Sequence, residues 1–142
     1  MILLVKLDND DLKRISLFES ITGAMVKDCV VLPDGNLVFL VKEGDLGRAI
    51  GKKGMAINKA RGAFKKRVDV FESSESLEGF VKNLFPGIEL KTFDVKDRSG
   101  RKQVVITVDS KDRGAVIGRN GDRIKLARTL LDRHYEADLK LL

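Results

Sequence analysis

Two glycine-bracketed turns are the stretches of this sequence whose residue types and spacing could do chemistry. Residues 51–54 read Gly-Lys-Lys-Gly, and residues 118–121 read Gly-Arg-Asn-Gly. Because glycine has no Cβ atom, a sugar–phosphate chain could come into direct contact with the main chain of such a turn. A helical pattern follows each turn, and the positive end of a helix attracts anions. The pattern therefore predicts two phosphate-binding turns, to which Lys52, Lys53 and Arg119 add charge.

The two turns belong to a longer internal repeat. Residues 45–61 align without gaps on residues 112–128, which lie 67 positions further on, and eight of the seventeen aligned positions are identical. The identical residues are Asp, Gly, Ile, Gly, Gly, Ile, Ala and Arg, so they include shape-determining positions as well as charged ones. One Gly-x-x-Gly alone is as readily a tight turn between helices, but two copies in the same setting favour a shared binding role.

Apolar and basic residues flank both turns. An isoleucine precedes each first glycine and another follows each second glycine by three residues. These isoleucines either form an apolar floor for bases or pack in the core, which is the more common place for isoleucine. Arg61, Arg123 and Arg128 either flank the same groove or face solvent. The candidate binding residues are Ile50, Gly51, Lys52, Lys53, Gly54, Ile57, Ile117, Gly118, Arg119, Asn120, Gly121, Arg123 and Ile124.

Composition narrows the function classes. The chain of 142 residues has a formal net charge of +6, which is consistent with a polyanionic partner. Cys29 is the only cysteine and His134 the only histidine, so disulfides, structural zinc sites and Cys/His catalytic pairs are excluded. We expect Cys29 to be a small buried hydrophobe and His134 to cap or stack locally. No paired carboxylates stand out, and the sequence predicts a protein that is not an enzyme and uses no cofactor or metal.

The sequence also predicts where the protein resides. No apolar run approaches the roughly 18 residues that span a bilayer. The apolar start, residues 1–5, is too short for a signal-peptide core and is followed by acidic residues. We therefore expect a cytoplasmic protein with no membrane partner.

Periodicity and turn chemistry predict the same order of elements twice. Asp8 is a plausible N-cap and Gly23 a stop for a first helix whose apolar face is Leu12, Ile15, Leu17, Phe18 and Ile21. The first unit continues with strands Val26–Leu32 and Leu37–Val41, a short helix Leu46–Ile50, a helix to about Lys65 and a strand Val68–Phe71. The second unit begins with a helix that Ser73 and Ser74 cap, that contains Leu77, Phe80, Val81 and Leu84, and that Pro86-Gly87 ends. A strand Glu89–Val95, a charged turn Lys96–Gly100, a strand Val104–Val108, a short helix to Ile117, a longer helix through Leu131 and a strand Leu139–Leu142 follow. The prediction is an α+β fold of two αββααβ units, residues 1–72 and 73–142, each with a three-stranded sheet packed on helices.

The residues around both turns resemble the signature of the KH domain. The stretches 49–57 (AIGKKGMAI) and 116–124 (VIGRNGDRI) are similar to its Gly-x-x-Gly loop, which clamps about four nucleotides of single-stranded RNA. The element order resembles the type II variant. The tandem arrangement and the stretches 17–24, 41–45 and 125–128 resemble the archaeal NusA-like transcription factors over essentially the whole chain.

That resemblance implies two type II KH domains that bind single-stranded RNA in transcription elongation or termination. Bacterial NusA also carries a polymerase-binding N-terminal domain and an S1 domain, and we expect neither in this chain. Contact with RNA polymerase or the transcription complex is therefore left open as a further partnership. A KH protein of ribosome assembly or RNA turnover would share the fold and the site, and it is the main alternative.

Two rival classes fit less well. Residues 47–53 superficially resemble a P-loop, but the two glycines are separated by three residues instead of four and no Ser or Thr follows the lysine. A DNA-binding helix-turn-helix is disfavoured because a hairpin precedes and a strand follows each turn. Neither turn contains an aromatic residue, which argues against stacking readers of the RRM or OB type.

Overall fold

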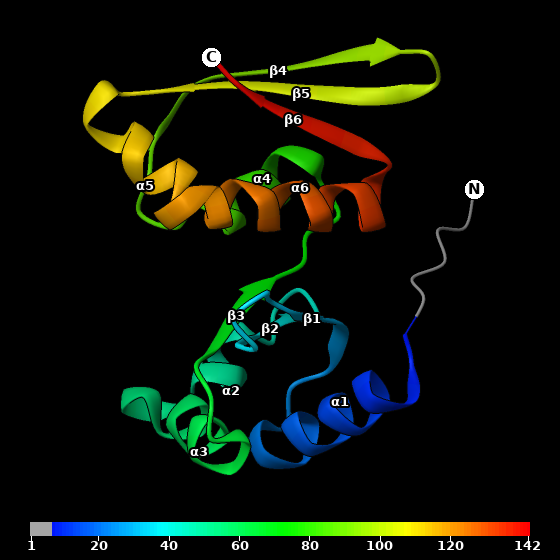
Figure 1. The fold of residues 1–142 in the computed structure, drawn as a ribbon, viewed down its shortest axis with the longest axis vertical. Helices are drawn as coiled ribbons and strands as arrows, with labels where there is room; N and C mark the ends of the chain where they lie inside the picture. Colours follow the sequence, from blue (N-terminus) through cyan, green and yellow to red (C-terminus); the bar gives the residue numbers. More distant parts are fainter. Residues whose placement is uncertain (1–6) are drawn as a thin grey trace. The chain divides into compact units, whose positions relative to one another are not determined.

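The computed structural model describes residues 7–142, so the apolar start predicted not to be a signal peptide lies outside the described part. The described chain forms two compact units, residues 7–76 and 77–142, here called the N-terminal and the C-terminal unit. Both have the predicted αββααβ order, and the α+β fold is confirmed. Figure 1 follows the chain through the two units.

The N-terminal unit consists of α1 (Asn9–Thr22), β1 (Val26–Val31), β2 (Leu37–Val41), α2 (Leu46–Ile50), a 3-10 turn (Lys52–Gly54), α3 (Met55–Phe64) and β3 (Val68–Glu72). The C-terminal unit consists of α4 (Leu77–Leu84), β4 (Leu90–Arg98), β5 (Arg101–Val108), a 3-10 turn (Ser110–Asp112), α5 (Arg113–Ile117), a second 3-10 turn (Arg119–Gly121), α6 (Asp122–Tyr135) and β6 (Ala137–Leu141).

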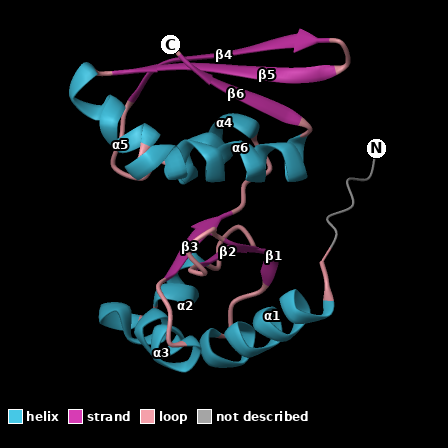
Figure 2. Ribbon diagram, in the orientation of Figure 1, coloured by secondary structure: helices cyan, strands magenta, loops and turns pink. Residues whose placement is uncertain are grey.

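Each unit has one three-stranded sheet with helices on one face (Figure 2). The strand orders are β1-β2-β3 and β4-β5-β6, so the middle strand of the unit is also the middle strand of the sheet. The first pair is antiparallel, and the last strand returns parallel to the middle one. A parallel return needs a crossover connection. In each unit the crossover consists of two helices, α2 and α3 or α5 and α6, with the glycine turn between them. The position of the turn is therefore set by the crossover.

Helix α1 begins and ends where its sequence predicts. Asp8 accepts a hydrogen bond of 2.7 Å from the N–H of Asp11, whose carboxylate accepts one of 3.2 Å from the N–H of Asp8. Gly23 ends the helix at φ 76°. The predicted apolar face was partly wrong, because Leu12 and Leu17 are 52% and 40% exposed. Helical periodicity places them on the flank of the helix, away from the buried pair Ile15 and Phe18.

An aromatic stack lies at the centre of the N-terminal core. The rings of Phe18 and Phe39 lie 4.2 Å apart at 12°, and Phe64 packs at 5.7 Å from Phe39. Cys29 is buried in the same cluster, as predicted for a small hydrophobe. In the C-terminal unit His134 lies edge-on to Phe80, which confirms its predicted local stacking.

The hairpin of the C-terminal unit differs from the prediction. The charged turn predicted over Lys96–Gly100 is wrong, since β4 runs to Arg98 and Lys96 pairs with Gln103. Only Ser99 and Gly100 turn, with φ angles of 53° and 82°. Positive φ at both central residues gives a two-residue turn whose twist matches that of the flanking strands. The sequence did not predict a strand over residues 96–98, because its exposed charged residues do not alternate with apolar ones.

Among residues 7–142, no helix combines the length and the apolar character that crossing a membrane requires. The same range holds no group of three His, Cys, Asp or Glu side chains placed to bind a metal ion.

Candidate nucleic-acid interface

The two glycine turns have nearly the same backbone. The first glycine has φ and ψ of 77° and 170° at Gly51, and of 78° and 176° at Gly118. The third residue is left-handed in both, at 55° and 26° for Lys53 and at 57° and 22° for Asn120. The hydrogen bonds also repeat, since the N–H of Gly51 reaches the carbonyl of Gly47 at 2.8 Å and that of Gly118 reaches Gly114 at 2.9 Å. The sequence repeat is therefore a repeat of loop geometry.

The first glycine of each loop has no room for a side chain. A Cβ atom on Gly51 would lie 2.7 Å from the backbone nitrogen of Ala56, and one on Gly118 would lie 2.5 Å from the Cβ of Arg123. The combination of positive φ with ψ near 180° is in any case a region that only glycine adopts readily. Each first glycine thus lets the loop close against the start of the following helix.

The helices after the loops begin without a side-chain cap. The N-caps of α3 and α6 are Gly54 and Gly121, and neither helix receives a capping hydrogen bond from a side chain. The first turn of a helix has N–H groups without partners inside the helix and a partial positive charge. An anion bound at the loop could satisfy these groups.

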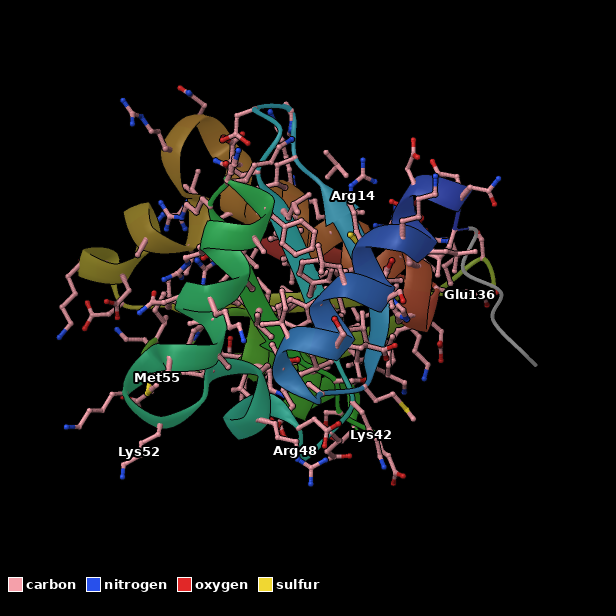
Figure 3. All side chains as sticks on the ribbon, turned by 90° about the horizontal axis from the view of Figure 1, so that it is seen from below. Arg14, Lys42, Arg48, Lys52, Met55 and Glu136 are labelled. Carbon is pink, nitrogen blue, oxygen red and sulfur yellow. The ribbon has the colours of Figure 1, made fainter. Side chains whose placement is uncertain are left out.

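The polar side chains of both loops point to solvent. Lys52 and Lys53 are exposed, and so are Arg119 and Asn120. Figure 3 shows Lys52 and Met55 at the same turn of the N-terminal unit, with the Lys52 side chain pointing away from the fold. Met55, which the sequence analysis did not single out, is 69% exposed. The surface of the N-terminal loop is therefore accessible to an extended ligand such as a nucleic-acid strand.

Comparisons with known proteins agree with this geometry. Residues 13–100 match the KH domain family. This chain belongs to the KH-domain family. It is 44% identical to the "Probable transcription termination protein NusA" of Methanococcus vannielii over 123 residues, which are 87% of this chain and 70% of that protein. It is 39% identical to the protein of the same name from Methanocaldococcus jannaschii, over 92% of this chain and 70% of that one.

A solved structure extends the comparison to the fold. The crystal structure of APE1850 superimposes with a TM-score of 0.81 at 42% identity and covers 96% of this chain and 100% of that one. The predicted resemblance to archaeal NusA-like proteins is confirmed.

The isoleucines of the two KH loops do not share one environment. Ile50 is 39% exposed, Ile57 and Ile117 are half-buried, and Ile124 is buried at 7% exposure. The first three have surface available for a ligand, whereas Ile124 mainly packs in the core. An apolar floor is thus more accessible in the N-terminal unit.

The flanking arginines of the KH units bond to the protein's own backbone. Arg61 donates from Nε and Nη2 to the carbonyl of Val68 at 3.2 and 3.1 Å, and Arg128 donates from Nε to Leu139 at 3.1 Å. These two equivalent residues fasten α3 and α6 to the strands that follow. The predicted place of these arginines, beside the groove or toward solvent, did not include these backbone contacts. Their identity in both repeats was the signal for a shared structural role.

Arg123 has a similar task at a different place. Its Nε and Nη2 donate to the carbonyl of Leu84 at 3.3 and 3.2 Å, so it joins the start of α6 to the end of α4. Arginine makes both bonds from its planar guanidinium, which the ammonium group of a lysine could not reproduce. Any contact of Arg123 with a ligand at the loop would share a guanidinium already hydrogen-bonded to the fold.

Proposed function

We propose that this NusA-like protein binds single-stranded RNA through both Gly-x-x-Gly loops and acts in transcription elongation or termination. The observation that carries the proposal is the repetition of one loop backbone, with the same glycine contacts and the same uncapped helix start, in two KH units. KH domains recognise single strands by holding about four nucleotides along such a loop.

Each loop residue has a physical role in the proposed clamp. Backbone N–H groups at the loop and the helix start face the phosphates, and glycine lets the RNA backbone approach. Lys52, Lys53 and Arg119 neutralise phosphate charge, and Asn120 donates from its amide. Ile50, Ile57 and Ile117 supply apolar surface for the bases. Because the loops have no aromatic residue, charge neutralisation carries a large share of the affinity.

The transcription role rests on the relatives. The proteins of Methanococcus vannielii and Methanocaldococcus jannaschii that align with most of this chain are both named as probable transcription termination proteins. We propose that the chain acts on the nascent transcript and that it associates with the transcription complex.

The clamp is tested by titrating a short single-stranded RNA pool of randomised sequence into the wild-type chain and a loop variant. The variant is Lys52→Asp/Lys53→Asp/Arg119→Asp/Asn120→Asp, and the control is Lys13→Glu/Lys82→Glu/Lys96→Glu. The control replaces exposed lysines on other elements and changes the net charge by nearly as much. We expect the loop variant to lose binding and the control to keep most of it.

Salt dependence adds a second readout. Each lost phosphate contact should flatten the slope of log K against log salt by roughly 0.7 for a single strand. Duplex DNA and a nucleoside triphosphate serve as competitors, and circular dichroism checks folding. Equal affinities of the loop variant and the wild type would overturn the clamp, as would preference for duplex DNA.

Association with the transcription complex is tested separately. The full chain is applied to immobilised elongation complexes, which are then washed with and without ribonuclease. Retention that survives ribonuclease supports a protein contact, and retention that ribonuclease removes supports a contact with the transcript alone. Equal capture by free RNA and by the complex would contradict a role specific to transcription.

A further inference from the structure

The residue that follows the second glycine differs between the two loops. Met55 is the first residue of α3, and Asp122 is the first residue of α6. The backbone is the same at both positions, with φ and ψ of −61° and −42° at Met55 and of −65° and −37° at Asp122. Both side chains are exposed. An apolar thioether and a carboxylate therefore leave the two loops from equivalent positions.

This difference changes the charge of the proposed phosphate site. The N-terminal loop carries Lys52 and Lys53, and the first turn of α3 has no acidic residue, which gives +2. The C-terminal loop carries Arg119, and Asp122 in the first turn of α6 cancels it to 0. At 0.15 M salt the screening length is about 8 Å, so charges on one loop act on the same phosphate.

Asp122 also places a negative charge at the start of α6, where a bound RNA phosphate would otherwise interact with the positive end of the helix. A carboxylate in the first turn stabilises a helix by interacting with its positive end. Helix α6 has this carboxylate and no side-chain cap at Gly121, whereas α3 has neither a carboxylate nor a cap. The start of α3 is thus left for an external anion, while the start of α6 already has an internal one.

Lys125 offsets part of the negative charge that Asp122 adds near the C-terminal loop. The Nζ of Lys125 lies 3.4 Å from the carbonyl oxygen of Asn120, one helical turn from Asp122. The equivalent residue of the N-terminal unit is Asn58, whose side-chain oxygen accepts from Arg61 at 3.1 Å. The ammonium of Lys125 is directed to a carbonyl of the loop, so it lowers the repulsion by Asp122 without restoring a second cation at the loop tip.

We infer that the N-terminal loop makes most of the phosphate contact and that Asp122 weakens phosphate binding at the C-terminal loop. The inference rests on the proposed function and assigns unequal shares to its two sites. Met55, exposed beside Lys52, gives the N-terminal loop an apolar and polarisable contact for a nucleobase (Figure 3). The strong site is therefore N-terminal, and the C-terminal site binds with less dependence on salt.

Two full-length variants with one altered loop each compare the sites. Lys52→Asp/Lys53→Asp leaves the C-terminal loop intact, and Arg119→Asp/Asn120→Asp leaves the N-terminal loop intact. Both are titrated with the same randomised single-stranded RNA pool from about 50 to about 200 mM salt, the range over which phosphate contacts change affinity strongly. We expect the protein with the intact N-terminal loop to bind at least about tenfold more tightly and to show the steeper salt slope.

The role of Asp122 is tested in the protein whose only intact loop is C-terminal. Asp122→Asn should tighten RNA binding by about threefold to fivefold at 0.1 M salt and steepen the slope by about 0.7, as expected for one charge. The control is Asp94→Asn, which changes the net charge equally on an exposed residue of β4. Equal effects of Asp122→Asn and Asp94→Asn would overturn the inference.

The reverse exchange is tested in the protein whose only intact loop is N-terminal. Met55→Asp should weaken binding by at least about fivefold and flatten the slope by about 0.7. Met25→Asp is its control, because Met25 is the other strongly exposed methionine of that unit, at 56%, and lies just before β1. If Met55→Asp and Met25→Asp bind RNA equally well, Met55 is not part of the phosphate-binding site and the inference is wrong.

Failure of the inference and failure of the proposed function give different results. If the wild type does not bind single-stranded RNA, or if altering both loops leaves binding intact, the proposed function fails. If binding needs the loops but both single-loop proteins have the same affinity and slope, only the inequality of the loops is wrong.

Discussion

The two units share a loop backbone but differ in the outer face of the sheet, the face away from the core cluster. In β2 every residue is buried, and the outward-facing Val38 and Leu40 are each 1% exposed. At the equivalent positions, 67 residues further on, β5 has Val105, which is also buried at 6% exposure, and Thr107, which is partly exposed; β4 is mostly exposed. The repeat therefore preserves the loop and the helix packing, while the other side of the sheet is free to diverge.

The crossover helix and the middle strand also differ in length. Helix α6 has 14 residues and α3 has 10, while β5 has eight residues and β2 has five. Four helical residues add about 6 Å and three strand residues about 10 Å. The longer helix thus accompanies a longer strand, and the loop at the helix start keeps its geometry in both.

The largest expected effect is in the cores. Phe39→Ala removes a ring stacked on Phe18 and should lower the stability of the N-terminal unit by about 3–5 kcal/mol. Ile106→Ala, 67 positions further on, should lower the stability of the C-terminal unit by about 2–5 kcal/mol. Hydrogen exchange of amides in β2 and β5 reports on each unit separately. Loss of protection in both strands from either substitution would show that the units unfold together.

The next effect concerns the first glycines of the loops. Gly51→Ala and Gly118→Ala should each destabilise by about 2–4 kcal/mol, because the backbone conformation is strained for alanine and the new Cβ meets the helix start. Gly62→Ala is the control, since a Cβ there meets nothing within 4 Å and alanine is the better helix former, so it should stabilise by about 0.5–1 kcal/mol. Denaturant unfolding measures all three variants, and a neutral Gly51→Ala would contradict the close-approach argument.

The smallest expected effect separates stability from binding at Asp122. Asp122→Asn should lower stability by about 0.3–1 kcal/mol, because α6 loses the carboxylate that interacts with its positive end. The same substitution is expected to tighten RNA binding. Thermal unfolding at low and high salt measures the loss, which should shrink as salt rises. A variant that is both more stable and tighter in binding would show that Asp122 does not act on the helix start.

Much of the fold was readable from the sequence because local signals agreed with one another. Asp8 and Gly23 each set a boundary by their own chemistry, and the internal repeat supplied the order of elements. The length of the β4–β5 ribbon was not readable, since alternation that would mark a strand is absent where both faces meet solvent. Leu12 and Leu17 were misplaced because apolar residues on a helix flank are common on protein surfaces.

The candidate site was only partly predictable from the sequence. The sequence predicted the loops and their equivalence through glycine spacing and the internal repeat, and the structure added the matching backbone angles. The contacts of Arg61 and Arg123 with backbone carbonyls depend on tertiary placement, which no spacing rule gives. The contrast between Met55 and Asp122 is present in the alignment of the repeats, but its meaning requires knowing that both residues begin a helix at an uncapped end.

The β4 strand has a consequence for behaviour at high concentration. It lies at the edge of its sheet, and four of its last five residues, Asp94 to Arg98, are charged. An edge strand offers unpaired backbone groups to strands of other molecules, and charged side chains oppose such pairing because they would have to lose water. The ribbon can therefore be long and exposed without becoming a template for aggregation.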